Sequence, residues 1–490
     1  MSDDGVQFSD GDGGRSTQRT GKDVFARAAA AVDADLAAAI SSADNWRTSY
    51  PQHLRRLTER AATSAQAGLA IARAGLDRVH ETFEFVAGGI ARPLPEVMRA
   101  AHTRLETRTT RGQGKPAAGL AVPYSGERLR TVALMRQLEQ WVADGVVEPA
   151  FAAAIIRVLE HPGWLDLTGT WFAVLGAGAE MAPTEWLLRW GADVVAVDIP
   201  RADIWRRLEA LAERGTGRLH VPVRPAADRG ADEPGVDLLT RTPDVVEWLE
   251  QFDRPLIVGN YTYAAGETFA RLAVAADALF VELQRRRGDV SVAYLATPTD
   301  TFAVGPEVVQ FARERQRRTG WVPGAAGLVR RVSRNRLLVP NYRETVRTDD
   351  GDDVGIADSL ILQQGPNYAL AKRLQRWRAD VAHDDGAFSA LHVAPPTRTR
   401  SVLHNRVIAA AYAGASLFDV ETFEPATSRA LMAALLVHDL RRRDEAATGQ
   451  LAQHHRTAAA AHGGLWRMAW EPRSALPLAV VRGASVLLRR

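Results

Sequence analysis

The alternation of apolar and polar positions divides the chain into three parts. Over residues 22–165 apolar side chains recur every three or four positions, as Leu54 and Leu57 do, which predicts a helical N-terminal region. Over residues 166–400 short apolar runs alternate with helical patterns. Helical spacing returns over residues 401–490, which we expect to form a helical C-terminal region and tail.

The middle part predicts a parallel sheet. Its apolar runs predict strands at residues 171–175, 193–198, 219–223, 255–258, 291–295 and 390–393. Strands that alternate with helices are typical of a parallel sheet with helices packed on it. We therefore predict an α/β fold with a doubly wound parallel Rossmann sheet. Residues 301–362 are expected to form an arginine-rich insertion, either a solvated helix and loop or a cover over a substrate pocket.

Two polar segments predict the limits of these parts. Residues 1–21 are rich in Asp, Gly and Ser and predict a disordered N-terminus. Residues 107–119 are polar and glycine-rich and predict a linker. Ser125 then predicts the start of the next helix.

The tail over residues 465–490 mixes tryptophans and aliphatic residues with arginines. We expect it to pack on its own domain, with a membrane surface or a second subunit as the alternatives. Pro472, Pro477 and Gly483 are expected to interrupt a continuous amphipathic helix. Because a second subunit is one of these alternatives, the protein could form a homo-oligomer through its tail.

Composition narrows the function classes. The chain has 490 residues, enough for two or three domains, and no cysteine, which excludes disulfides, thiolate zinc sites, iron–sulfur clusters and cysteine nucleophiles. The net charge is only +3, so we expect no nucleic-acid partner. No apolar run approaches the roughly 18 residues of a membrane span, so no integral membrane segment is expected. These features predict a cytoplasmic protein with a small-molecule substrate.

A glycine turn follows the first predicted strand. Gly176-Ala177-Gly178 lies between that strand and a predicted helix over residues 183–190. In a dinucleotide-binding fold the first glycine allows a tight turn and the second lets the backbone approach a pyrophosphate, whose charge the helix N-terminus favours. Asp198 follows about 20 residues later, where a carboxylate accepts from a ribose hydroxyl. The pattern predicts nucleotide binding; a turn that serves only helix–strand packing is the alternative.

Asp198 also bears on the choice of cofactor. Its carboxylate favours NAD, because it would repel the 2′-phosphate of NADP. Arg201, Arg206 and Arg207 follow it and would offset that repulsion, which leaves NADP open. A solvated helix face explains the same arginines.

Tyr368 and Lys372 lie four residues apart at the start of a predicted helix, on one of its faces. A nearby ammonium favours the phenolate and lowers the pKa of a tyrosine toward a value useful for proton transfer. Only Lys22, Lys115 and Lys372 are lysines among 61 lysines and arginines. A lysine where the chain usually has arginine indicates a task for a compact ammonium. A surface pair is the alternative.

Taken in order over residues 168–399, the motifs resemble the short-chain dehydrogenase/reductase family. Gly176 matches its glycine-rich turn, and Asn260 ends a strand where the family has an Asn-Asn-Ala-Gly segment. Tyr368 and Lys372 match its Tyr-x-x-x-Lys pair.

Two further places extend the resemblance. Thr297, after the strand at residues 291–295, falls near the position of the family's catalytic serine, with Thr299 as the competing candidate. The segment from Val393 to Thr399, which contains Pro395, looks like the family's proline segment beside the nicotinamide.

The resemblance implies an NAD(P)-dependent oxidoreductase that acts on a carbonyl or an alcohol. Tyr368 would exchange a proton with the substrate, Lys372 would lower the pKa of that tyrosine and hold the nicotinamide ribose, and Thr297 would orient the substrate oxygen. The residues implied to contact the cofactor, NAD or else NADP, are Gly176, Gly178, Asp198, Asn260, Lys372, Pro395 and Thr399.

The chain also departs from the family pattern. Glu180 and Ala182 replace two glycines of the turn, residues 301–362 are inserted before the tyrosine, and the helix after Asn260 holds no asparagine for the family's fourth catalytic residue. These departures favour a non-catalytic Rossmann scaffold as one alternative. An S-adenosylmethionine-dependent methyltransferase is another, because that class also places a glycine turn after strand one and an acidic residue after strand two.

Overall fold

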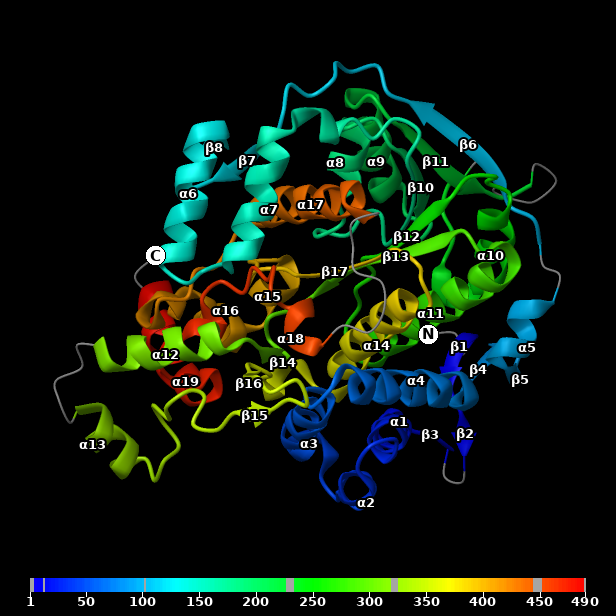
Figure 1. The fold of residues 1–490 in the computed structure, drawn as a ribbon. Helices are drawn as coiled ribbons and strands as arrows, with labels where there is room; N and C mark the ends of the chain where they lie inside the picture. Colours follow the sequence, from blue (N-terminus) through cyan, green and yellow to red (C-terminus); the bar gives the residue numbers. More distant parts are fainter. Residues whose placement is uncertain are drawn as a thin grey trace.

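The structure, a computed structural model, describes residues 4–11, 14–100, 103–225, 233–318, 325–443 and 452–488. At its centre lies a seven-stranded sheet (Figure 1). From edge to edge the strands are β17 (Ser389–Val393), β13 (Val290–Ala296), β12 (Leu256–Asn260), β9 (Trp171–Leu175), β10 (Asp193–Val197), β11 (Arg218–Val223) and β6 (Glu106–Arg111). Every neighbouring pair is parallel except β11 and β6, which are antiparallel.

The chain changes direction across the sheet at β9. The strands β9, β10 and β11 follow one another toward one edge, whereas β12, β13 and β17 follow one another toward the opposite edge. All six strands predicted for the middle part are confirmed, each within two residues at either end. Because these strands are parallel, the segments that follow them all leave from one side of the sheet.

Apolar side chains alternate between the two faces of the sheet. In β9, Ala173 and Leu175 belong to one buried cluster and Phe172 and Val174 to another. The first cluster includes helices α10 (Leu238–Glu250), α11 (Glu267–Arg287) and α14 (Pro366–Asp384). The second includes α6 (Thr131–Ala143), α7 (Pro149–Glu160), α8 (Thr184–Arg189), α9 (Ala202–Arg214) and α17 (Pro425–Arg441). Helices therefore cover both faces.

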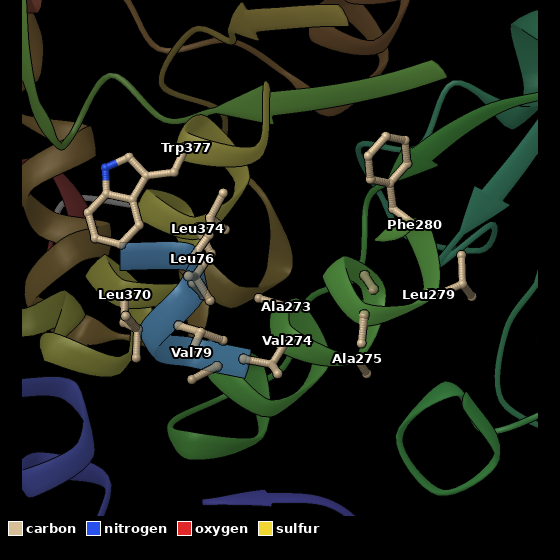
Figure 2. Close-up of a cluster of buried hydrophobic side chains, with 14 of the residues drawn as sticks. Leu76, Val79, Ala273, Val274, Ala275, Leu279, Phe280, Leu370, Leu374 and Trp377 are labelled. Carbon is tan, nitrogen blue, oxygen red and sulfur yellow. The ribbon is translucent and has the colours of Figure 1, made fainter. Parts of the chain in front are cut away.

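The N-terminal helices share the first of these clusters. They are α1 (Thr17–Ala30), α2 (Ala34–Ser41), α3 (Trp46–Ala61), α4 (Ala65–Thr82) and α5 (Leu94–Arg99). Figure 2 shows Leu76 and Val79 of α4 in one cluster with Leu374 of α14 and Val274 of α11. The predicted N-terminal region therefore packs on the sheet domain as part of one core.

The prediction of a disordered N-terminus is wrong for the residues that the structure describes. Strand β1 (Gly5–Phe8) pairs antiparallel with β4 (Phe83–Ala87), which pairs with β5 (Ile90–Pro93). A short ladder joins β2 (Asp10–Gly11) and β3 (Gly14–Arg15). Val6 and Phe8 are buried. Two apolar residues in a polar segment were too few to predict a strand whose partner lies more than 70 residues away.

The predicted linker is wrong over residues 107–111, which belong to β6, the antiparallel edge of the sheet, whereas residues 112–119 form no helix or strand. Its side chains are nearly all exposed, so no apolar alternation marks it. The first boundary predicted for the sheet domain, at residue 166, is therefore too late. Ser125 begins no helix: it lies at φ +49° in the turn between β7 (Ala121–Tyr124) and β8 (Glu127–Arg130), and α6 begins only at Thr131.

The insertion and the C-terminal part meet beyond the sheet. The insertion contains β14 (Thr301–Val304), α12 (Pro306–Arg318), α13 (Ala325–Val332), β15 (Val346–Arg347) and β16 (Asp353–Asp358). The C-terminal part contains α15 (Arg400–His404), α16 (Arg406–Ala413), α18 (Gln453–Arg456) and α19 (Pro472–Leu487). Short 3-10 turns lie at η1 (Pro162–Leu165), η2 (Leu362–Gln364), η3 (Ala415–Phe418) and η5 (Leu465–Arg467).

The tail packs on its own chain, as predicted, because α19 lies against α16 (Figure 1). The predicted interruption is wrong: α19 runs through Pro477 and Gly483, and Pro472 occupies its first turn. A Cβ atom on Gly483 would lie 1.7 Å from the carbonyl oxygen of Ala410, and one on Gly414 would lie 2.0 Å from that of Ala479. Glycine therefore lets the two helix backbones touch. Within the described ranges, no helix combines the length and apolar character needed to cross a membrane.

Candidate functional site

The carboxyl ends of the parallel strands bring most of the predicted site residues to one side of the sheet. Gly176 follows β9, Asp198 follows β10, and Asn260 ends β12. Thr297 follows β13 and Pro395 follows β17 shortly after its end. In parallel α/β sheets this is the side on which ligands bind.

Gly176 is required by the backbone of the turn. Its φ is +75°, a region that side chains disfavour, and a Cβ atom there would lie 2.9 Å from the backbone of Thr262. The N–H groups of Gly176 and Ala177 both donate to the carbonyl of Val197, at 2.8 and 3.2 Å. The turn is therefore held against β10 and the loop after β12.

Gly178 is enclosed by α9. Its N–H donates to Oδ2 of Asp198 at 2.8 Å, and its carbonyl accepts from Arg207 at 2.5 Å. A Cβ atom on Gly178 would lie 2.6 Å from the side chain of Ile204. The packing alternative for this turn therefore has direct support at both glycines.

Asp198 keeps capacity to bind a ligand. Its Oδ1 accepts from the N–H of Ile199 at 2.9 Å, so each carboxylate oxygen has one backbone donor and a lone pair to spare. Burial raises the pKa of Asp198 despite the N–H groups of Gly178 and Ile199. A ribose hydroxyl is a suitable donor for such a carboxylate.

The surroundings of the turn suit phosphate groups in part. The side chains of Arg207 and Arg400 are exposed beside it. Glu180, in contrast, places a carboxylate there, accepting from the backbone N–H of Arg400 at 2.8 Å. Arg207 donates to the carbonyl of Gly178, and the guanidinium of Arg400 lies 3.5 Å from the carboxylate of Glu180, so both arginines beside the turn already have partners within the chain.

Tyr368 lies in the first turn of α14, which begins with Pro366 after Gly365 at φ +80°. Its ring packs against Phe269 of α11, with the ring centroids 5.4 Å apart. Burial raises the pKa of the Tyr368 phenol, and a hydrogen bond with Thr297 acts in the opposite direction. Thr297, which the family resemblance implied to orient the substrate oxygen, therefore lies within hydrogen-bond reach of the Tyr368 phenol.

Lys372 lies one turn further along α14. Its Nζ donates to the carbonyl of Leu295 at 2.9 Å and to Gln375 at 3.1 Å, and it lies 5.6 Å from the ring centroid of Phe269. Burial lowers the pKa of Lys372 to about 8. The prediction that Lys372 lowers the pKa of Tyr368 is therefore wrong: its ammonium faces the end of β13, and burial raises the pKa of Tyr368. The alternative of a surface pair is wrong, because neither Tyr368 nor Lys372 is exposed.

These side chains line a small recess with about 180 Å³ of space free of protein atoms, part of it open to solvent, and too narrow in this structure to hold a water molecule. Thr297 and Thr299 share a hydrogen bond at 2.8 Å, and Gln364 donates to Thr299 at 2.7 Å. Both threonines therefore lie at this recess, and either could take the position of the family's catalytic serine. The other described residues that line it include Tyr368, Lys372, Tyr50 and Asp300.

Sequence reasoning missed Tyr50, Gln364 and Asp300. Tyr50 comes from α3 and donates to the carbonyl of Ile361 at 3.1 Å, a contact between distant segments that no local pattern reveals. Burial raises the pKa of Asp300, but Arg373 and Arg376 lower it by more, so the net pKa is lowered. The guanidinium of Arg373 lies 2.9 Å from the Asp300 carboxylate. The one available signal was the position of Asp300 directly after the Thr-Pro-Thr segment.

Three predicted cofactor residues lie outside this recess. Asn260 accepts from the N–H and the hydroxyl of Thr262, at 3.1 and 2.7 Å, and so is turned toward its own loop. The carbonyl of Pro395 accepts from the hydroxyl of Thr397 at 2.8 Å. Thr399 precedes α15 and shares a hydrogen bond with Ser401 at 3.0 Å. They border the strand ends without facing Tyr368.

A larger cavity begins at Thr299 and extends away from the sheet. About 720 Å³ of it is free of protein atoms, part of this space being continuous with solvent. Its walls come from the end of the insertion, from the segment after β17, and from α16 and α19. Thr299 lines both this cavity and the recess, which are therefore adjacent.

Neither a scan against protein-family models nor a search of curated proteins finds a match to this chain. Function is therefore inferred from the geometry of the site.

Proposed function

We propose that the chain is an NAD(P)-dependent oxidoreductase of the short-chain dehydrogenase type, acting on a carbonyl or an alcohol. The observation that carries this proposal is the convergence of Tyr368, Thr297 and Lys372 on one recess at the carboxyl side of the sheet. Buried polar and ionisable groups gathered in a cleft are typical of active sites.

The sheet supports the proposal. Counted along the chain, its six parallel strands lie in the order 6-5-4-1-2-3, and helices cover both faces. This is the strand order of the doubly wound Rossmann fold, which binds dinucleotides where the order reverses. In this chain the reversal lies between β9 and β12, next to Gly176 and Asn260.

The chain's own residues supply proton transfer and orientation. The phenol of Tyr368 is protonated at neutral pH and so has a proton to give to a carbonyl oxygen that is being reduced, although burial raises its pKa and makes it a weaker acid. The hydroxyls of Thr297 and Thr299 orient that oxygen. Lys372 contributes a compact amine beside the site, and Asp198 accepts from a ribose hydroxyl. The bound cofactor would supply the hydride.

Cofactor binding is tested by thermal shift with NADH, NADPH and S-adenosylmethionine. We expect NADH to stabilise the protein and Asp198→Asn to weaken NADH binding about tenfold, because the amide is a poorer acceptor for the ribose. The amide keeps the shape of the carboxylate and one acceptor oxygen, which can serve the N–H of Gly178 but leaves the N–H of Ile199 without its acceptor. Asp203→Asn, at an exposed position on α9, is the matched control. A shift with S-adenosylmethionine alone would instead indicate a methyltransferase.

One observation favours a second candidate, a non-catalytic scaffold. Both backbone groups of Gly178 are already bonded within the chain, to Asp198 and Arg207. A scaffold predicts no thermal shift with any of the three nucleotides and no turnover of any carbonyl or alcohol.

A further inference from the structure

We propose that the larger cavity binds an uncharged aliphatic carbonyl or alcohol, with its oxygen toward Thr299 and its hydrocarbon chain between α16 and α19. The assignment of the reacting end rests on the function proposed above; the assignment of an apolar ligand rests on the cavity alone.

The lining of the cavity is apolar over most of its surface. α16 contributes Val407, Ile408 and Ala411, and α19 contributes Ala475 and Leu476. None of the described residues that line it carries a charge. Hydrocarbon gains free energy by leaving water for such a surface, whereas an ion would lose its hydration without gaining a partner.

Three polar side chains line the cavity near the Tyr368 site: Thr299, Tyr412 and Ser359. Thr299 connects the cavity to the Tyr368 site. Tyr412 lines the cavity and lies near enough to contribute to the raised pKa of Tyr368. Ser359 also lines it, is 1% exposed, and has a hydroxyl without a hydrogen-bond partner among the described residues.

The Ser359 hydroxyl indicates a ligand oxygen. A buried hydroxyl is normally hydrogen-bonded, and leaving it unpaired costs free energy. A carbonyl or hydroxyl oxygen at the inner end of the cavity would supply the missing partner. Such an oxygen would also lie on the side of Thr299 and Tyr368.

The neighbouring charges do not recruit an anion. Asp358 precedes Ser359, but its carboxylate is paired with Arg473 and lies 3.8 Å from Arg55. The insertion contributes Ser359 and Ile361 to the lining and none of its arginines. A carboxylate ligand would therefore find no free cation in the described wall.

The cavity opens through an apolar rim. Val407 lines it and is 43% exposed, which places α16 at the opening. An exposed apolar residue at an opening suits the entry of an apolar molecule.

The experiment is a calorimetric titration with decan-1-ol and, separately, with decanoate, in the absence of nucleotide. We expect decan-1-ol to bind at least tenfold more tightly than decanoate. Ala475→Phe, which fills the cavity from α19, should weaken decan-1-ol binding at least tenfold. Ala484→Phe, at an exposed position of the same helix, should leave it unchanged.

Ala475 is 1% exposed, so its variant is checked for folding by circular dichroism. Ala411→Phe, at a partly exposed position on α16, provides the same test if Ala475→Phe does not fold. Equal decan-1-ol binding in the wild type and in a folded filling variant, tighter binding of decanoate, or no binding of decan-1-ol would overturn the proposal.

The titration separates this inference from the proposed function. Binding of decan-1-ol without any thermal shift by NADH or NADPH would retain the apolar site and reject the oxidoreductase. A thermal shift with NADH without binding of decan-1-ol would support the oxidoreductase and reject the apolar site.

Discussion

The two halves of the sheet end in different ways at its carboxyl side. After β9 and β10, the groups of the glycine turn bind one another: Gly178 donates to Asp198 and accepts from Arg207. After β13 the chain instead places side chains against cavities, among them Thr297 and Thr299. The first half is explained by packing, whereas the second places half-buried polar side chains around a recess.

This difference shows what a short motif can establish. A Gly-x-Gly turn after a strand is required both by a phosphate and by a close helix, so its presence does not distinguish the two. Hydroxyls and an amine gathered around a recess at the strand ends are, in contrast, typical of functional sites. The Tyr368 half therefore carries more of the functional inference than the glycine half.

The largest expected effect is on turnover in the Tyr368 half. Tyr368→Phe removes only the hydroxyl, so turnover should fall by about 10²- to 10⁴-fold, the range typical of losing a general acid. The variant should keep its thermal stability and its shift with NADH, because the ring still packs on Phe269. Steady-state kinetics with a carbonyl substrate makes the measurement, and full retention of activity would remove Tyr368 from the mechanism.

In the glycine half we expect a loss of stability with or without nucleotide. Gly176→Ala places a Cβ atom 2.9 Å from the backbone of Thr262 at a φ of +75°, and should lower the free energy of unfolding by about 1–3 kcal/mol. Gly163→Ala is the control, because nothing lies within 4 Å of its Cβ position. Urea unfolding measures both. A neutral Gly176→Ala would contradict the packing explanation of the turn.

A pH-dependent effect is expected at Lys372. Burial lowers the pKa of Lys372 to about 8 from a usual value of 10.5, so between these values the folded protein binds fewer protons than the unfolded chain. Stability then rises with pH across that window, by at most about 1.4 kcal/mol per pH unit, and stays at its lower level below pH 8.

Lys372→Met should abolish this rise. The measurement is the difference in the free energy of unfolding between wild type and variant, taken by urea titration from pH 7 to pH 10.5. Parallel curves over the whole range would show that the amine is not buried as the structure has it.

Local patterns predicted the part of the fold that is locally encoded. The six parallel strands follow from runs such as Trp171–Leu175, whose residues are apolar because both faces of the sheet are covered. Strand β6 could not be predicted, because an exposed edge strand needs no apolar alternation. Its partner β11 lies roughly a hundred residues later in the chain.

The site divides in the same way. Tyr368 and Lys372 were predicted from their spacing on one helix, and Thr297 from the resemblance to the short-chain dehydrogenase family. They lie together because strand ends meet on one side of a parallel sheet and α14 begins beside them. Tyr50 and the apolar cavity were not predicted, since their positions depend on contacts between distant segments. Ala475 and Thr299 line one cavity although they are separated by most of the insertion, α14, β17 and α17.

This separation along the chain has a consequence for biosynthesis. A ribosome releases β13 and α14 well before α19, so a growing chain can complete its sheet while one wall of the apolar cavity is still unmade. Until Ala479 has emerged, Ile408 and Ala411 of α16 face solvent, and exposed apolar surface of this kind promotes association of unfinished chains. A chain truncated before Pro472 would lack α19 and would keep this apolar groove exposed permanently. The last helix is therefore needed to close the cavity.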